Sequence, residues 1–375
     1  MSQIPKANGT DRHQKTCIFL PRLESLRGLA ALAVAFYHSF SILPATGNQA
    51  LVIRGLTNIV YGPGGVFFFY ILSGLVLGMS IRRYSSVGFS EYFDFMGRRV
   101  RRLYPALVVT TIAYTLYWLV FIPEYSPITD AFSSVPPPVT FLSIVKNILL
   151  LDVSINGVTW SLQVEMICSL MLPILHFATR HSAVLRGVMF LFLSSIYFAY
   201  RFTGCSIGTN TLSCYLFMFY LGYILVNLES VIRHTTNFRP WIPMAIFVCA
   251  SLVCCTTPHF GNNLFLFAIG AAAIISLITF NYQLLPFQFL DLLIVRFYGK
   301  ISYSFYLLHP LSIAVVGRES LHLIPGKYLA QSPVLSGLGI FIFSVALATP
   351  LAYLCYTYVE RPFLKSSKPL HRSSA

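Results

Sequence analysis

A series of long apolar segments is the feature that most constrains how this chain folds. A bilayer core of about 30 Å needs about 20 apolar residues per helix. Hydrophobic residues make up 56% of the 375 residues and charged residues only 10%, too few for a water-soluble domain. We therefore predict an all-α, polytopic integral membrane protein with about ten transmembrane helices, at residues 25–45, 61–81, 103–122, 160–178, 184–201, 211–228, 241–257, 262–281, 298–317 and 334–358.

The distribution of positive charge predicts the orientation. The chain has 26 Lys and Arg residues against 12 Asp and Glu, a net charge of +14. If the N-terminus is cytoplasmic, the exterior segments hold only a few of these cations: Arg54, Lys146, Arg201, Arg318 and Lys327. By the positive-inside rule, we then expect both termini to lie in the cytoplasm. The predicted location is the plasma (inner) membrane, which the chain would cross several times. We expect the positive charge of the protein to interact with the lipid bilayer and not with nucleic acid.

One membrane domain is predicted to fill the chain. We divide the sequence into a cytoplasmic N-terminal segment (1–22), a transmembrane domain (23–363) and a cytoplasmic tail (364–375). The stretch Pro123–Thr159, with three consecutive prolines, is expected to be an irregular exterior lid. The eight cysteines form no CxxC pair, so no metal site is predicted.

Ionisable groups within apolar spans are the candidate functional residues, because a bilayer makes them costly. Arg27 and His38 are eleven residues apart and so share one helix face, with about 16.5 Å between them. The pair suits an extended ligand with an anionic head, such as a coenzyme A thioester. The alternative is that Arg27 only obeys the positive-inside rule and His38 is a hydrogen-bonded core residue.

Three further motifs carry polar groups. GRRVRRLYP places Arg98, Arg99, Arg101 and Arg102 in two RxxR pairs that suit phosphate, or that merely anchor the chain at the membrane surface. In WSLQVEM, Glu165 lies beside Trp160 and either orients an imidazole or pairs with a basic group.

ISYSFYLLHP forms one polar stripe of Ser302, Tyr306 and His309 on an apolar helix. Pro310 removes a backbone donor there and leaves the carbonyl of Tyr306 for a ligand or a neighbouring helix. The segment Phe67–Gly74 (FFFYILSG) is interpreted as a packing and lipid-facing helix.

These motifs together resemble the integral-membrane acyltransferase-3 family of membrane-bound O-acyltransferases. The resemblance runs from LESLRGLAALAVAFYH through FFFYILSGLVL, RRVRRLYPAL, WSLQVEM and ISYSFYLLHP to YVERPF, from Leu23 to about Phe363. It implies an enzyme that moves an acyl group, usually acetyl, from cytoplasmic coenzyme A to an extracytoplasmic glycan.

The resemblance also implies roles for individual residues. His38 would be catalytic, as general base or as acyl carrier, with Glu165 in support. Arg27 and the Arg98/Arg101 pair would contact the acyl donor, and we add Arg99 and Arg102 to this set. We assign substrate binding to the remaining polar and aromatic candidates, Trp160, Ser302, Tyr306 and His309.

The predicted function is therefore acetyl-CoA-dependent O-acetylation of a saccharide or glycan hydroxyl, with acetyl-CoA as donor and no metal. The alternative is a transporter or exporter of a saccharide or small metabolite, because buried His and Glu groups also serve proton-coupled transport. A cluster of cytoplasmic arginines favours the enzyme, since a carrier of neutral sugars needs no phosphate site. The sequence leaves the oligomeric state open.

Overall fold

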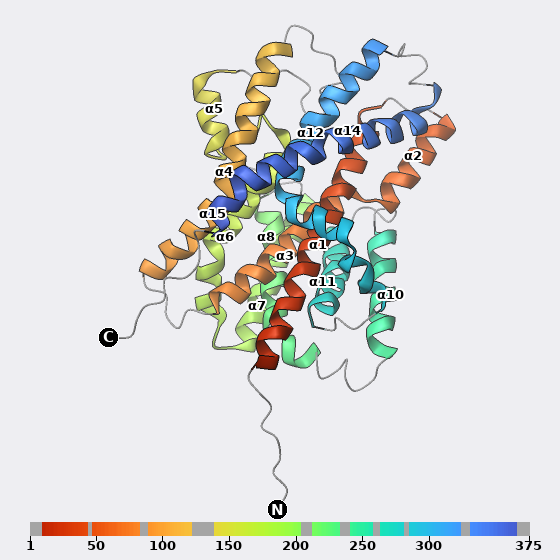
Figure 1. Cartoon of the computed structure of the whole chain (residues 1–375). Helices are drawn as coiled ribbons and strands as arrows, with labels where there is room; N and C mark the ends of the chain where they lie inside the picture. Colours follow the sequence, from red (N-terminus) through yellow and green to blue (C-terminus); the bar gives the residue numbers. More distant parts are fainter. Residues whose placement is uncertain are drawn as a thin grey trace, which may run out of the picture.

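A computed structural model describes residues 10–43, 47–82, 89–121, 139–203, 212–232, 241–257, 263–280, 285–323 and 331–365. Within these ranges every regular element is helical and no strand occurs, as predicted (Figure 1). The elements are α1 (Thr10–Ser41), α2 (Gly47–Ile59), α3 (Gly62–Ile81), α4 (Phe89–Phe121), α5 (Phe141–Ile148), η2 (Gly157–Thr159), α6 (Trp160–Thr179), α7 (Ala183–Thr203), α8 (Leu212–Asn227), α10 (Trp241–Thr256), α11 (Leu264–Phe280), η3 (Leu285–Asp291), α12 (Leu293–Leu323), α14 (Pro333–Cys355), the π-helical turn η4 (Tyr356–Glu360) and α15 (Arg361–Lys365).

A helix covers the core of each of the ten predicted spans. Among the described residues, five helical stretches are long and apolar enough to cross a membrane, or six if α11 and η3, bent by 78°, form one span. The apolar helices at Tyr215–Asn227 and Trp241–Thr256 are shorter. The structure thus agrees with a membrane protein, whereas the number of ten spans and the orientation stay predictions.

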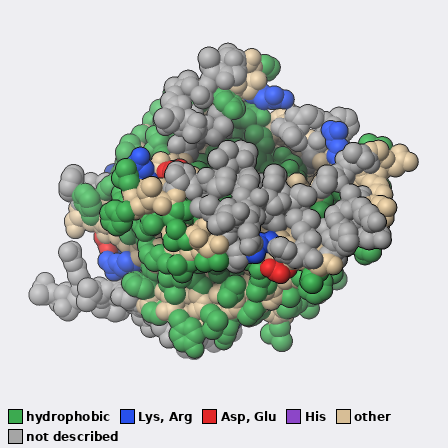
Figure 2. Space-filling model, turned by 90° about the horizontal axis from the view of Figure 1, so that it is seen from above, with side chains coloured by type: hydrophobic (Ala, Val, Ile, Leu, Met, Phe, Trp, Pro, Cys, Tyr) green, Lys and Arg blue, Asp and Glu red, His purple; other side chains and the backbone are tan. Residues whose placement is uncertain are grey.

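The described surface carries many large apolar side chains. On α4, for example, Ile112, Leu116 and Val120 are exposed at helical spacing. Figure 2 shows hydrophobic side chains over much of the described surface, with few charges between them. A surface of this kind is expected where lipid replaces water as the solvent.

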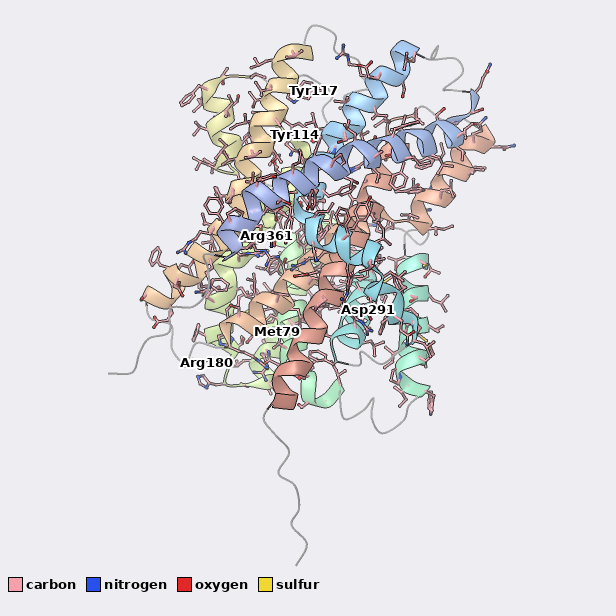
Figure 3. All side chains as sticks on the ribbon, viewed as in Figure 1. Met79, Tyr114, Tyr117, Arg180, Asp291 and Arg361 are labelled. Carbon is pink, nitrogen blue, oxygen red and sulfur yellow. The ribbon has the colours of Figure 1, made fainter. Side chains whose placement is uncertain are left out.

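Arg180, which we assign to the cytoplasmic side, lies at the same end as the beginning of α1, whereas Tyr114 and Tyr117 lie toward the opposite end of α4 (Figures 1 and 3). The beginning of α1 and the end of α4 thus lie at opposite ends of the molecule.

The helices α1 and α12 pack side by side at glycines. A Cβ atom on Gly28 would lie 2.5 Å from the backbone nitrogen of Gly299, and one on Gly299 would lie 2.7 Å from the backbone of Glu24. Small residues allow such close approach of helix backbones in membranes, where packing rather than water drives association. Gly28 and Gly299 therefore fix the distance between the two helices that carry the candidate residues His38 and His309.

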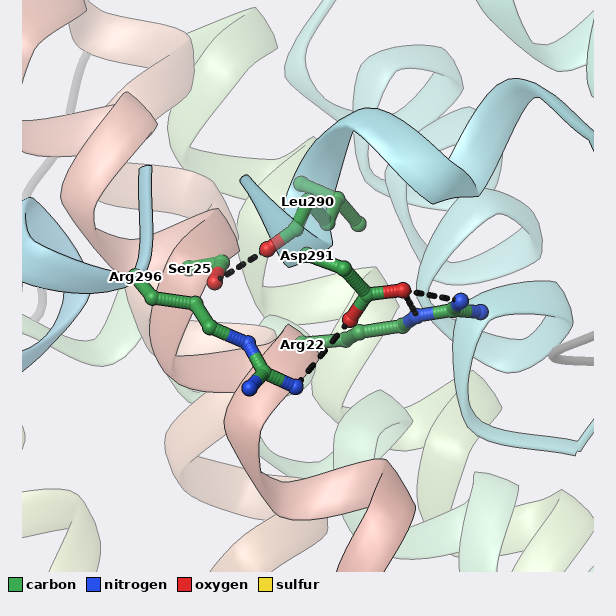
Figure 4. A network of polar contacts seen from close by, with 5 residues as sticks. All are labelled: Arg22, Ser25, Leu290, Asp291 and Arg296. Carbon is green, nitrogen blue, oxygen red and sulfur yellow. Dashed lines mark hydrogen bonds and ion pairs between the residues drawn. The ribbon is translucent and has the colours of Figure 1, made fainter. Parts of the chain in front are cut away.

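A polar network connects α1, through Arg22 and Ser25, with η3 and α12 (Figure 4). The guanidinium of Arg22 donates from Nε to Oδ2 of Asp291 at 2.9 Å, and Arg296 donates to Oδ1 of the same carboxylate at 3.2 Å. Nearby, the Ser25 hydroxyl donates to the Leu290 carbonyl at 2.7 Å. This network supports the same helix pair as the glycines.

The predicted exterior lid is wrong in part. Within Pro123–Thr159, residues 123–138 lie outside the described residues, but Phe141–Ile148 form the helix α5 rather than irregular structure. A capping box explains it: the Thr140 side chain accepts from the Ser143 backbone nitrogen, and the Ser143 hydroxyl accepts from that of Thr140.

We predict that Gly28→Ala destabilises the protein. The added methyl group would have to separate the backbones of α1 and α12, and overpacking of this kind costs about 1–3 kcal/mol. Gly187→Ala is the matched control, because a Cβ there meets no atom within 4 Å, and alanine favours the α7 helix. Thermal unfolding in detergent should show a lower Tm for Gly28→Ala only; equal Tm values would contradict the close helix contact.

Candidate active site

One cavity gathers polar side chains from five helices. It encloses about 640 Å³ of space not filled by atoms, part of it open to the surroundings. Its polar lining comes from α1, α3, α4, α6 and α12: Arg27, Ser73, Arg99, Arg102, Ser161, Glu165, Ser302, Tyr303 and Tyr306, together with Tyr70. The structure therefore brings together Arg27 with half of the arginine motif, Glu165 and two residues of the α12 stripe.

A buried ion pair forms one wall of the cavity. Arg99 on α4, only 6% exposed, pairs with the carboxylate of Glu165 on α6 and also donates to the Ser169 hydroxyl at 3.1 Å. The Ser73 hydroxyl donates to the same carboxylate at 2.8 Å. Of the two roles considered for Glu165, the structure shows the pairing with a basic group.

The four arginines of GRRVRR divide into two groups. Arg98 pairs with Asp94 one turn earlier on α4, and Arg101 is exposed; neither lines the cavity. Arg99, which is buried, and Arg102, which is exposed like Arg101, do line it. Because α4 is helical throughout, residues three apart share a face, and the Arg99/Arg102 face is the one turned to α6 and α12.

The stripe on α12 leads from the cavity to a pair of histidines. Ser302 and Tyr306 line the cavity, and the hydroxyls of Tyr306 and Ser161 are hydrogen-bonded at 2.8 Å. One turn further on, Nε2 of His309 lies 3.0 Å from Nδ1 of His38. His309 is 1% exposed, and His38 is partly buried. The stripe thus connects the arginines with the predicted catalytic imidazole.

The sequence matches the model of a known protein family over the region that contains this site. A model of the acyltransferase domain of the acyltransferase-3 family matches residues 20–356. The chain belongs to the acyltransferase-3 family. The matched region includes every candidate residue above, so the cavity and the histidine pair lie within the family's own domain.

Two viral proteins are similar to this acyltransferase. A protein of Acidianus two-tailed virus, named as a candidate acetyltransferase, is 27% identical over 315 residues, 79% of this chain and 84% of its own length. An O-acetyl transferase of Shigella phage Sf6 is 27% identical over 197 residues, 49% of this chain and 53% of its own. No solved structure matches the chain.

Among the described residues, no group of three or more His, Cys, Asp or Glu side chains could hold a metal ion.

Trp160, the remaining predicted substrate residue, does not line the cavity. Its ring packs edge-on against Tyr70 at 6.5 Å and near Tyr215 at 5.7 Å.

Sequence reasoning missed Tyr70. It lies in the segment interpreted as packing, yet it lines the cavity, is 1% exposed, and its hydroxyl has no hydrogen-bond partner among the described residues. A buried donor without a partner is unusual and calls for an explanation. The only signal in the sequence was a tyrosine inside a run of phenylalanines.

We expect Tyr70→Phe to leave the Tm of the empty protein unchanged or slightly higher, because the lost hydroxyl has no partner. Tyr303→Phe is the comparison: this hydroxyl lines the same cavity but donates to the Leu103 carbonyl at 2.7 Å, so its loss should cost about 1 kcal/mol. Thermal unfolding measures both. A large loss of stability in Tyr70→Phe alone would show that its hydroxyl is bonded within the protein.

Proposed function

We propose that this acyltransferase moves an acetyl group from cytoplasmic acetyl-CoA to a hydroxyl of an extracytoplasmic saccharide or glycan. The observation that carries the proposal is the cavity in which Arg27, Arg99 and Arg102 meet, joined by the α12 stripe to His38 and His309. The names of the two viral relatives favour acetyl as the transferred group.

Charge balance in the cavity favours an anionic donor. Three guanidinium groups line it against one carboxylate, Glu165, which is already engaged by Arg99. Arg27 and Arg102 are then the groups whose charge a ligand phosphate can neutralise, and a guanidinium binds phosphate through two parallel hydrogen bonds. The phosphates of coenzyme A would supply that charge.

The dimensions of the site favour an elongated donor. Arg27 and His38 are about 16.5 Å apart along α1, and Ser302 and His309 about 10.5 Å apart along α12. A ligand held by its phosphates at the arginines must therefore extend past Tyr306 to bring a reactive carbonyl to His38. The flexible pantetheine arm of coenzyme A is of this kind.

We assign His38 the role of general base, in preference to acyl carrier. Its imidazole takes the proton of the acceptor hydroxyl while the oxygen attacks the thioester carbonyl. The bond from carbonyl carbon to sulfur then breaks, and the thiolate of CoA leaves and receives a proton. The acetyl ester of the saccharide and free CoA are the products.

The first test is binding of acetyl-CoA to the protein in nanodiscs by calorimetry. We expect Arg27→Gln and Arg102→Gln each to weaken binding about 10-fold or more, because each loses a charged hydrogen bond to phosphate. The double variant Arg98→Gln/Arg101→Gln, which alters the pair implied by the family resemblance, should weaken it less. No binding to the folded wild-type protein would favour the transporter instead.

The second test separates chemistry from binding. His38→Ala should bind acetyl-CoA with nearly unchanged Kd but lose saccharide-dependent release of free CoA, by about 10²–10⁴-fold for a general base. A thiol reagent measures the release in the presence of a panel of saccharides. Full release by His38→Ala would contradict its catalytic role.

A further inference from the structure

The two histidines form a hydrogen bond in a favourable direction. Nδ1 of His38 and Nε2 of His309 are 3.0 Å apart, the ring planes are within 5° of parallel, and the ring centres are 5.3 Å apart. The distance between the ring centres exceeds the distance between the two nitrogens by about two ring radii, so both nitrogens lie on the line that joins the centres. Because the ring planes are also parallel, the rings are coplanar and meet edge to edge. In this geometry the N–H of one ring points along the lone pair of the other.

A backbone carbonyl determines which nitrogen carries the hydrogen. Nδ1 of His309 lies 2.7 Å from the carbonyl oxygen of Tyr306. A carbonyl oxygen only accepts hydrogen bonds, so Nδ1 of His309 must carry a hydrogen. In neutral His309 the lone pair is then on Nε2, which accepts from Nδ1–H of His38.

Pro310 makes that carbonyl available. In a regular helix the carbonyl of Tyr306 would accept from the backbone N–H of residue 310, but proline has none. The side chain of His309 takes the place of this missing donor. From the sequence, a ligand or a neighbouring helix was expected to use this carbonyl, whereas the adjacent histidine contacts it in the structure.

We propose that His309 is a positioning residue that holds His38 in its Nδ1–H tautomer, with the proton-accepting lone pair on Nε2, through the chain Tyr306 carbonyl, His309, His38. The same hydrogen bond stabilises the imidazolium form, because Nδ1 of His38 stays a donor after Nε2 takes up a proton. In hydrolytic triads an aspartate orients the catalytic histidine and stabilises its imidazolium form. Here the neutral imidazole of His309 has this role, without adding a charge to the membrane interior.

The use of this tautomer in catalysis rests on the proposed function, but the tautomer itself does not. Histidine nitrogen NMR on isotope-labelled protein in nanodiscs distinguishes protonated from unprotonated ring nitrogens. The chain has nine histidines, and spectra of His38→Ala and His309→Leu assign the two signals of interest. We expect wild-type His38 to be protonated at Nδ1 and unprotonated at Nε2, and His309→Leu to convert it to a mixture of tautomers.

The matched pair of variants is His309→Leu and His309→Gln. Leucine removes the acceptor, whereas the side-chain oxygen of glutamine can accept from Nδ1–H of His38. We expect His309→Leu to lower kcat for acetyl transfer about 10²-fold, with the KM for acetyl-CoA unchanged, and His309→Gln to recover most of that loss.

The outcomes separate the two proposals. Wild-type His38 protonated at Nε2, or an NMR signal of His38 unaffected by His309→Leu, would overturn the role of His309. The expected tautomers in a protein that binds no acetyl-CoA would support the histidine pair and contradict the proposed function. Equal kcat losses in the Leu and Gln variants, with altered KM, would assign His309 to substrate binding instead.

Discussion

The close contact of α1 and α12 is the constraint on which the rest of the site depends. At Gly28 and Gly299 the two backbones approach so closely that neither position has room for a methyl group. His38 is on one of these helices and His309 is on the other, at a separation that suits a hydrogen bond between their rings. A wider crossing would separate the imidazoles and break the hydrogen bond between His38 and His309, at a cost in stability.

The charged side chains that line the cavity are three arginines and one glutamate. Glu165 and Arg99 neutralise each other, and Ser73 and Ser169 satisfy further hydrogen-bonding groups of the pair. This arrangement places a rigid, neutral pair at the wall of the cavity. Arg27 and Arg102 add positive charge to the lining, which Glu24 and Glu360 offset in part from nearby. In our proposal a bound anion neutralises the rest, and this attraction is larger in a medium of low polarity than in water.

Much of this arrangement could be predicted from sequence, because helical periodicity is a local property. The shared face of Arg27 and His38 and the stripe on α12 follow from spacing alone. The inward pair within GRRVRR does not, because both RxxR pairs have the same spacing and only the neighbouring helices decide between them. The contact between His38 and His309 spans 271 residues and depends on a helix crossing that no local pattern encodes.

The hydrogen bonds from His38 to His309 and from His309 to Tyr306 end at a main-chain atom, the carbonyl oxygen of Tyr306. The carbonyl oxygen at position 306 is present whatever amino acid occupies that position, whereas the tyrosine side chain there faces the cavity. A substitution at position 306 can therefore alter the wall of the cavity and still retain the carbonyl that, in our proposal, orients His309 and His38. In the proposed mechanism, one residue thus contributes to the substrate cavity through its side chain and to the orientation of the base through its main chain.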